Sequence, residues 1–149
     1  MDLDTIKTAA LDLSWERMRD IWRANDLADE LARRLGADRD AVARALSEVA
    51  CADDRSDCAL YRIGDIIAVR RDAEYLQIYE QDGETVVKLT NSPIGKWSNG
   101  ILVSIRGMWA VKIEEDGGTA LADGYKIAEV VERYDEVAAK YLRAIWRVP

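Results

Sequence analysis

The clearest pattern of apolar and polar positions lies in the stretch ELARRLGADRDAVARALSEV. Leu31 and Leu35 fall on one face of a helix, since residues four apart lie one turn above each other. Gly36 follows at once, and glycine ends a helix readily because it adopts a left-handed backbone at little cost. Val42 and Leu46 then repeat the helical spacing. The pattern predicts two short helices joined by a tight turn at Gly36.

This spacing resembles the helix-turn-helix of bacterial and archaeal transcription regulators, closely over residues 26–49 and more loosely over residues 15–71. The resemblance implies a winged-helix protein that binds duplex DNA, with the second helix in the major groove. The side chains expected to face the bases are Arg39, Asp40, Ala43, Arg44 and Ser47. Asp38 is expected to cap this helix by accepting from an amide of its first turn. Asp38 and Asp40 stand where such motifs usually carry Ser or Thr.

From Ala59 to Ile113 the apolar residues tend to alternate with polar ones, which is the period of a β-strand. Asp82-Gly83 between two such runs predicts a hairpin turn. A hairpin that directly follows the second helix would be a wing. Its arginines would then contact phosphate or the minor groove: Arg62, Arg70 and Arg71. The alternative is that these are ordinary solvent-facing charges on strands.

The end of the chain has a pattern that predicts one long helix from about Gly124 to Arg147. Its apolar residues step by four and three, as in a heptad repeat: Ile127, Val131, Tyr134, Ala138, Tyr141 and Ile145. A second stripe, which includes Leu142 and Trp146, makes the apolar surface wider than a single contact requires. We therefore expect this stripe to pair with a second subunit in a homodimer. Trp97, in a polar loop, either tucks over the sheet or projects as a partner contact.

Near the N-terminus, residues 2–12 can form a short helix. Trp15, Met18 and Trp22 then repeat at helical spacing, and we expect the two tryptophans to be core anchors. The alternative is a partly exposed groove for a partner. Together the patterns predict an α+β protein with an N-terminal helix-turn-helix bundle in residues 1–58, an antiparallel β-sheet in residues 59–122, and a long C-terminal helix in residues 123–149 that packs on the sheet or on a dimer partner.

The charge of the chain favours an alternative to DNA. The 149 residues include 28 Asp and Glu against 21 Lys and Arg, a net charge of −7. Residues 1–59 hold 14 acidic and 9 basic side chains, so the acidic excess lies mainly in the part that resembles a helix-turn-helix. Modules that bind duplex DNA normally carry a basic face, because phosphate neutralisation supplies most non-specific affinity. The alternative is an acidic protein-interaction module or inhibitor of the mobile-element type, similar in size and charge to anti-CRISPR proteins and other DNA mimics, which would bind a nucleic-acid-binding protein.

Few residues of the chain carry catalytic or metal-binding chemistry. There is no His, which is the commonest general base, and no cofactor fingerprint, so we expect neither an enzyme nor a cofactor. Cys51 and Cys58 make only half of a tetrahedral zinc site, and Asp53, Asp54 and Asp57 lack the spacing and the closing Glu of an EF-hand loop. No apolar run approaches the ~20 residues that span a bilayer, and we expect a cytoplasmic protein. Its thiols would then be reduced, although a disulfide is geometrically possible.

Overall fold

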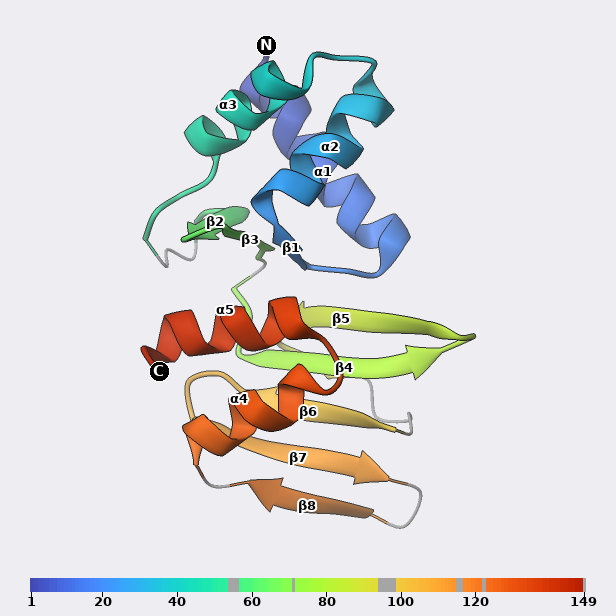
Figure 1. Ribbon diagram of the computed structural model, residues 1–149, viewed down its shortest axis with the longest axis vertical. Helices are drawn as coiled ribbons and strands as arrows, with labels where there is room; N and C mark the ends of the chain where they lie inside the picture. The colour runs from blue at the N-terminus through green and yellow to red at the C-terminus, as the bar shows by residue number, and fades with distance from the viewer. Residues whose placement is uncertain (54–56, 71, 94–98, 115–116, 122, 149) are drawn as a thin grey trace. The chain divides into compact units, whose positions relative to one another are not determined.

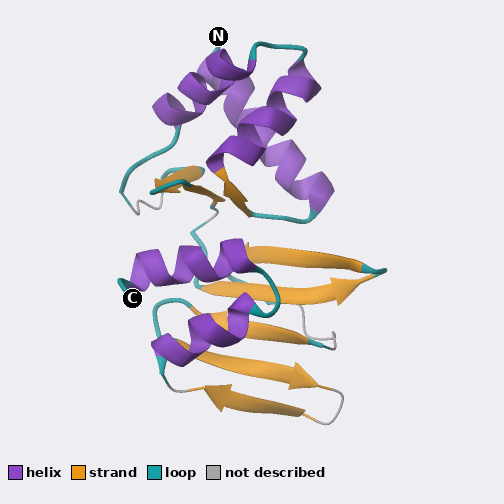
Figure 2. Ribbon diagram, in the orientation of Figure 1, coloured by secondary structure: helices purple, strands orange, loops and turns teal. Residues whose placement is uncertain are grey.

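The computed structural model describes residues 1–53, 57–70, 72–93, 99–114, 117–121 and 123–148. The protein is α+β, as the sequence predicts, and it divides into two compact units, Met1–Arg71 and Asp72–Pro149. Each unit has helices and an antiparallel sheet of its own (Figure 1 and Figure 2).

Unit 1, Met1–Arg71, combines three helices with a three-stranded sheet in its described residues. Its elements in chain order are α1 (Leu3–Arg17), β1 (Ile21–Arg23), α2 (Ala24–Leu35), α3 (Arg39–Val49), β2 (Leu60–Ile63) and β3 (Ile66–Val69). The apolar stripes of the three helices and one face of the sheet meet in a single core. Its most deeply buried members include Ile6, Leu27, Leu31, Val42, Leu46 and Ile67.

The turn between α2 and α3 forms as the sequence predicts. Gly36 ends α2 in the left-handed region, with φ at 60°, where a residue with a Cβ atom is strained. The Asp38 carboxylate caps α3 by accepting a 3.1 Å hydrogen bond from the amide of Ala41. Val42 and Leu46 are buried together. The predicted pair of helices, its turn and its buried face are therefore confirmed.

Strand β1 is not predicted by the sequence pattern, because Trp22 continues the helical spacing of Trp15. The structure instead ends α1 at Arg17, after which Met18 adopts a left-handed backbone with φ at 52°. Trp22 lies on β1, is buried, and donates from its indole N–H to the hydroxyl of Ser14 at 3.0 Å. Trp15 is 69% exposed. The prediction that Trp15 is a core anchor is therefore wrong, because α1 turns the face with Ile6, Ala10 and Leu13 to the core and Trp15 lies outside that face.

Unit 2, Asp72–Pro149, contains a five-stranded antiparallel sheet with the strand order β5-β4-β6-β7-β8. Its elements are β4 (Tyr75–Gln81), β5 (Glu84–Thr90), β6 (Gly100–Ser104), β7 (Trp109–Glu114), β8 (Gly117–Leu121), α4 (Gly124–Glu132) and α5 (Glu136–Trp146). The two helices cover one face of this sheet (Figure 1). Asp82 and Gly83 both have positive φ between β4 and β5, so the hairpin predicted from this dipeptide is confirmed.

The C-terminal region forms two helices, so the prediction of one long helix is wrong. The Asp135 carboxylate starts α5 by accepting a 2.9 Å hydrogen bond from the amide of Ala138. Such a cap favours a new helix start because it satisfies an amide that has no partner within the first turn. Arg143 of α5 then donates to Glu132 of α4 at 3.2 Å, which joins the two helices.

The β region of the sequence is divided between the two units. Strands β2 and β3 form a sheet with β1, whereas β4 to β8 form the sheet of unit 2. The boundary between the two compact units falls after residue 71 of the chain, whereas the sequence suggests a division after residue 58. The difference arises from β1, because this short strand pairs with β3 and keeps the β2–β3 hairpin with the helices.

Candidate nucleic-acid interface

The solvent-facing side of α3 carries charges of both signs. Asp40, Arg44, Ser47 and Glu48 are exposed, whereas Ala43 is half-buried against the core. Arg44 thus lies one helical turn from a carboxylate on either side. Within the described part of unit 1, Arg44 forms no ion pair, so its guanidinium is available to an anionic partner.

Arg39 lies at the start of α3 but is held by α2. Its Nε donates to the Asp29 carboxylate at 2.9 Å, and a terminal nitrogen donates to the side-chain oxygen of Asn25 at 2.8 Å. The hydrogen bond to Asp29 raises the pKa of Arg39 above its ordinary value. Because both partners lie on α2, Arg39 links the start of α3 to α2 and uses two of its five N–H donors there. No local spacing in the sequence marks Asn25 or Asp29 for this role.

Arg62 lies at the junction between α3 and the β2–β3 hairpin. Its guanidinium donates to the hydroxyl of Ser47 at 2.7 Å and to the carbonyl oxygen of Gly64 at 3.2 Å. The Ser47 hydroxyl in turn donates to the carbonyl oxygen of Ala43 at 3.2 Å. The structure thus brings together three of the residues predicted for the interface, Ala43, Ser47 and Arg62, and these contacts hold the hairpin against the end of α3.

The other two hairpin arginines do not join this cluster. Arg70 lies beyond the end of β3, away from the hairpin turn, and is only 5% exposed. Arg70 is therefore not beside the hairpin turn at Gly64-Asp65, where the predicted phosphate contact would lie, because it follows the opposite end of β3. Arg71 lies outside the described residues.

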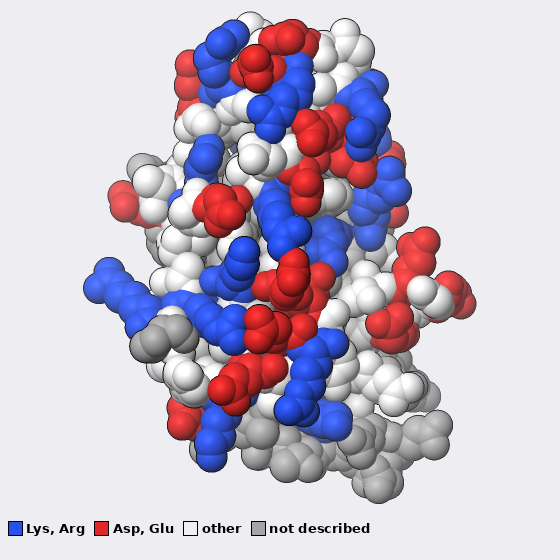
Figure 3. All heavy atoms as spheres, viewed as in Figure 1, with Lys and Arg blue, Asp and Glu red and all other residues white. Residues whose placement is uncertain are grey.

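The basic side chains of α1 and α2 are largely engaged by acidic neighbours. Arg34 donates to both oxygens of Glu16, at 2.6 and 2.7 Å, and Glu30 forms ion pairs with Arg17 and Arg33. The hydrogen bond from Arg34 lowers the pKa of Glu16. Figure 3 shows the result, since acidic and basic side chains are intermingled over the visible face of the helices of unit 1. The visible face of these helices is therefore not a continuous basic surface.

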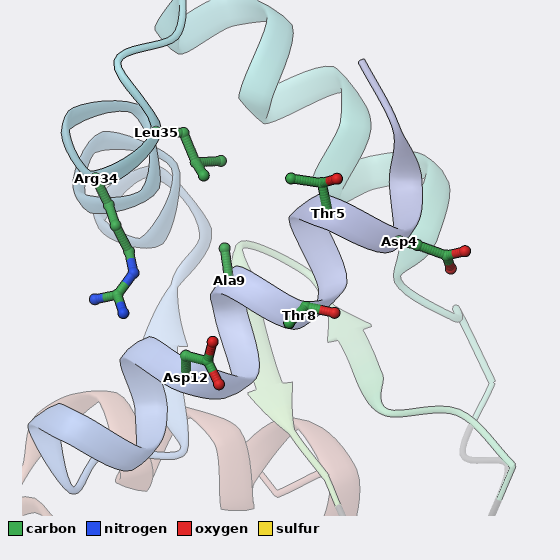
Figure 4. A pocket seen from close by; sticks show the side chains of 7 residues that line it. All are labelled: Asp4, Thr5, Thr8, Ala9, Asp12, Arg34 and Leu35. Carbon is green, nitrogen blue, oxygen red and sulfur yellow. The ribbon is translucent and has the colours of Figure 1, made fainter.

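An open hollow of about 410 Å³ lies between α1 and the end of α2. Figure 4 shows that Arg34 and Asp12 extend toward each other beside it, with Ala9 and Leu35 as apolar walls, whereas Asp4 points away. The guanidinium of Arg34 is already bonded to Glu16. The hollow is therefore a surface depression with a mixed polar and apolar lining, and the guanidinium that lines it is already paired.

The residues predicted to contact a second subunit are used inside unit 2. Leu142 is fully buried, and the Trp146 indole N–H donates to the carbonyl oxygen of Ile105 at 2.8 Å. The part of the predicted dimer stripe that rests on Leu142 is therefore wrong, because this side chain is fully buried in its own chain, whereas Trp146 is half-buried. Trp97 lies outside the described residues.

A disulfide joins Cys51 to Cys58, whose Cα atoms are 6.2 Å apart. The thiols expected to be reduced are thus paired. Cys51 lies two residues after the end of α3 and forms a β-bridge with Tyr61 on β2. The disulfide therefore closes the loop that connects α3 to the hairpin.

Among the helices in the described ranges, none has the length and apolar character needed to cross a bilayer. Comparisons with protein-family models, with curated proteins and with solved structures found no match to this chain. The candidate interface therefore has to be interpreted from its own geometry.

Proposed function

We propose that unit 1 is a winged helix-turn-helix module that binds duplex DNA. In this assignment α2 and α3 are the helix-turn-helix, α3 is the recognition helix, and the β2–β3 hairpin is the wing. The observation that carries the proposal is the order of the elements, α1-β1-α2-α3-β2-β3, together with the sheet order β1-β3-β2. A recognition helix followed directly by a hairpin that packs beside it presents two adjacent elements to one duplex.

The side chains at the junction of α3 and the wing support particular roles. Arg44 is exposed on the middle of α3, where a guanidinium can donate to a guanine edge in the major groove. Arg62 reaches from the wing to Ser47 on α3, so its remaining donors suit a phosphate beside the groove. Arg39 is assigned a positioning role, because its bonds to Asp29 and Asn25 hold α3 at its angle to α2.

Salt dependence of binding to a mixed-sequence DNA duplex tests the proposal. Affinity measured by fluorescence anisotropy should fall linearly on a log–log plot as salt rises, because each phosphate contact releases counterions. The slope should be shallow, at about 0.9 for each phosphate contacted, since few basic side chains of the described interface are available. Absence of duplex binding at low ionic strength would contradict the proposal.

A second candidate function is binding of a protein that itself binds nucleic acid. It is favoured by the exposed carboxylates of Asp40 and Glu48 on either side of Arg44. It is also favoured by the 15 acidic and 12 basic residues within residues 1–71, a net charge of −3. Under this reading the same helix presents negative charge to a basic surface. The test is whether this chain prevents a basic DNA-binding protein from binding its duplex. Such inhibition would favour this function if this chain does not itself bind the duplex.

The homodimer expected from the sequence is part of the DNA-binding proposal, because dimers read two half-sites of an operator. The subunit contact has to use a surface other than Leu142, which is fully buried in its own chain. Sedimentation of the native protein at micromolar concentration tests it, and a monomer under those conditions would contradict the dimer.

A further inference from the structure

The loop between α3 and β2 is tied to the hairpin by both backbone and side-chain bonds. The amide of Cys51 donates to the carbonyl oxygen of Leu60 at 2.9 Å, and the carbonyl oxygen of Cys51 accepts from the amide of Arg62 at 2.8 Å. The bond between the side chains of Arg62 and Ser47 lies beside this bridge. These three bonds connect the end of α3 to β2.

The disulfide is the covalent part of the same connection. Cys51 sits on the bridge, and Cys58 lies two residues before β2, so the bond closes a loop with a sequence separation of seven residues. Closing a loop lowers the chain entropy of the open state and therefore favours the bridged conformation. Both cysteines are half-buried rather than enclosed in the core, so small thiols and disulfides can reach them, as a reversible bond requires.

We propose that Cys51 and Cys58 form a reversible thiol–disulfide site that controls how firmly the wing is held against α3, and thereby duplex affinity. The oxidised form is the tighter binder, because the wing and the recognition helix are already in their binding arrangement. In the reduced form the bridge at Cys51 opens more often, and Arg62 loses its fixed place beside Ser47. The part that concerns affinity rests on the proposed DNA-binding function.

The oxidation can be written with a low-molecular-weight disulfide such as glutathione disulfide as the oxidant. One cysteine thiolate attacks this disulfide, forms a mixed disulfide and releases one glutathione thiol. The second cysteine thiolate attacks the protein sulfur of the mixed disulfide and releases the second glutathione thiol. Two electrons and two protons pass from the protein thiols to the oxidant, and the reverse exchange with excess glutathione restores both thiols.

The first measurement does not depend on DNA. The full chain is equilibrated in reduced and in oxidised glutathione, its free thiols are counted by alkylation and mass spectrometry, and amide hydrogen exchange is followed. Reduction should speed exchange of the amides of Cys51 and Arg62 on the order of tenfold. The amide of Val69 donates to the backbone carbonyl oxygen of Asp20 and serves as the internal control. Its exchange rate should change little on reduction.

The second measurement is duplex affinity of both forms on a mixed-sequence DNA duplex at low ionic strength. The oxidised form should bind on the order of tenfold more tightly, and the double variant Cys51→Ser with Cys58→Ser should match the reduced form in both buffers.

Two results would contradict a reversible thiol–disulfide site at Cys51 and Cys58. One is thiols that stay free in excess glutathione disulfide, and the other is equal amide hydrogen exchange in both forms. Equal affinity of two forms that both bind would overturn its control of binding and leave the DNA-binding proposal intact. Absence of duplex binding by both forms would contradict the DNA-binding proposal and, with it, the control of affinity. Hydrogen exchange would still decide whether the disulfide holds the hairpin against the end of α3.

Discussion

The indole N–H of Trp146 donates a 2.8 Å hydrogen bond to the carbonyl oxygen of Ile105, which fastens the end of α5 to the turn after β6. Replacing Trp146 with Phe removes this donor and part of the packing. The free energy of unfolding of unit 2 should fall by about 1–3 kcal/mol, measured by urea denaturation. The control is Trp15→Phe at a 69% exposed position, where a change within about 0.5 kcal/mol is expected. Equal effects of the two substitutions would mean that Trp146 is not an internal anchor.

Truncation of Leu46 tests the core beneath α3. Leu46 is 1% exposed in the cluster that joins the three helices of unit 1. Leu46→Ala should destabilise unit 1 by about 2–5 kcal/mol, because it loses buried surface and leaves a cavity. Thermal melting followed by circular dichroism measures the effect, and Leu3→Ala at a half-buried position is the control, with a smaller loss. A melt unchanged by Leu46→Ala would show that the packing of α3 on α1 and α2 is different.

The proposed phosphate contact of Arg62 gives a prediction for DNA binding. Arg62→Ala removes a proposed phosphate contact, so the slope of log affinity against log salt should fall by about 0.9. It also removes the bond to Ser47. The matched control is Lys7→Ala, which removes one exposed cation from α1 in the same unit. Anisotropy on one duplex should separate the two variants, and equal salt slopes for both would argue against a wing at this hairpin.

Asp40 separates the two candidate functions. If α3 reads bases, an exposed Asp40 can accept from a cytosine amino group. Asp40→Ala should then relax base preference at one position by about 1–3 kcal/mol without abolishing binding, as measured by competition with single-base duplex variants. Asp26→Ala on the exposed first turn of α2 is the control. A substitution that leaves duplex binding absent or unchanged but weakens a complex with a basic protein would favour the acidic-module reading.

The bond between Glu16 and Arg34 predicts a small acid-dependent loss of stability. This bond lowers the pKa of Glu16 below its ordinary value of 4.5. When folding lowers the pKa of a carboxyl group, the group adds stability to the folded state. This stability is fully present at a pH above the pKa of the unfolded state, and it is lost as the pH falls through the lower pKa of the folded state. The thermal midpoint should therefore drop more steeply for the native protein than for Glu16→Gln between about pH 5 and pH 3.

The pair is exposed, so the difference between these two pH profiles should be small. The control for this comparison is Glu48→Gln, which removes an exposed carboxyl group from α3 and leaves the bond between Glu16 and Arg34 intact. Its profile should follow that of the native protein. A Glu16→Gln profile that also runs parallel to the native one would show that the bond adds no stability in solution.

Local signals in the sequence were sufficient where a single residue type determines the backbone. Gly36 and Asp38 specify the end of one helix and the start of the next, and the structure has both. The same holds for the hairpin at Asp82-Gly83. At these positions the conformational freedom of glycine and the short acceptor of aspartate act within a few residues, so the pattern alone predicts the geometry.

The features that the sequence did not reveal depend on contacts between distant residues or on competing signals. Strand β1 exists because it pairs with β3, and its three residues are too few to alternate. The heptad spacing runs unbroken through the turn before α5, although Asp135 was a visible signal for a new helix start. At the candidate interface, the sequence predicts that Arg39 faces outward, whereas the structure bonds it to Asn25 and Asp29. The burial of Arg70 likewise has no local marker.

The pairing of β1 with β3 also affects the order in which the protein can fold during its synthesis. Ile21 lies opposite Ala68 in the register of the sheet, so the three helices leave the ribosome well before the strand that completes their sheet. Until that strand emerges, β1 has no partner and the aromatic ring of Trp22 has no sheet to pack in. A nascent chain that ends at residue 58 should therefore remain sensitive to protease, and protection should begin only when the chain beyond Val69 has cleared the exit tunnel.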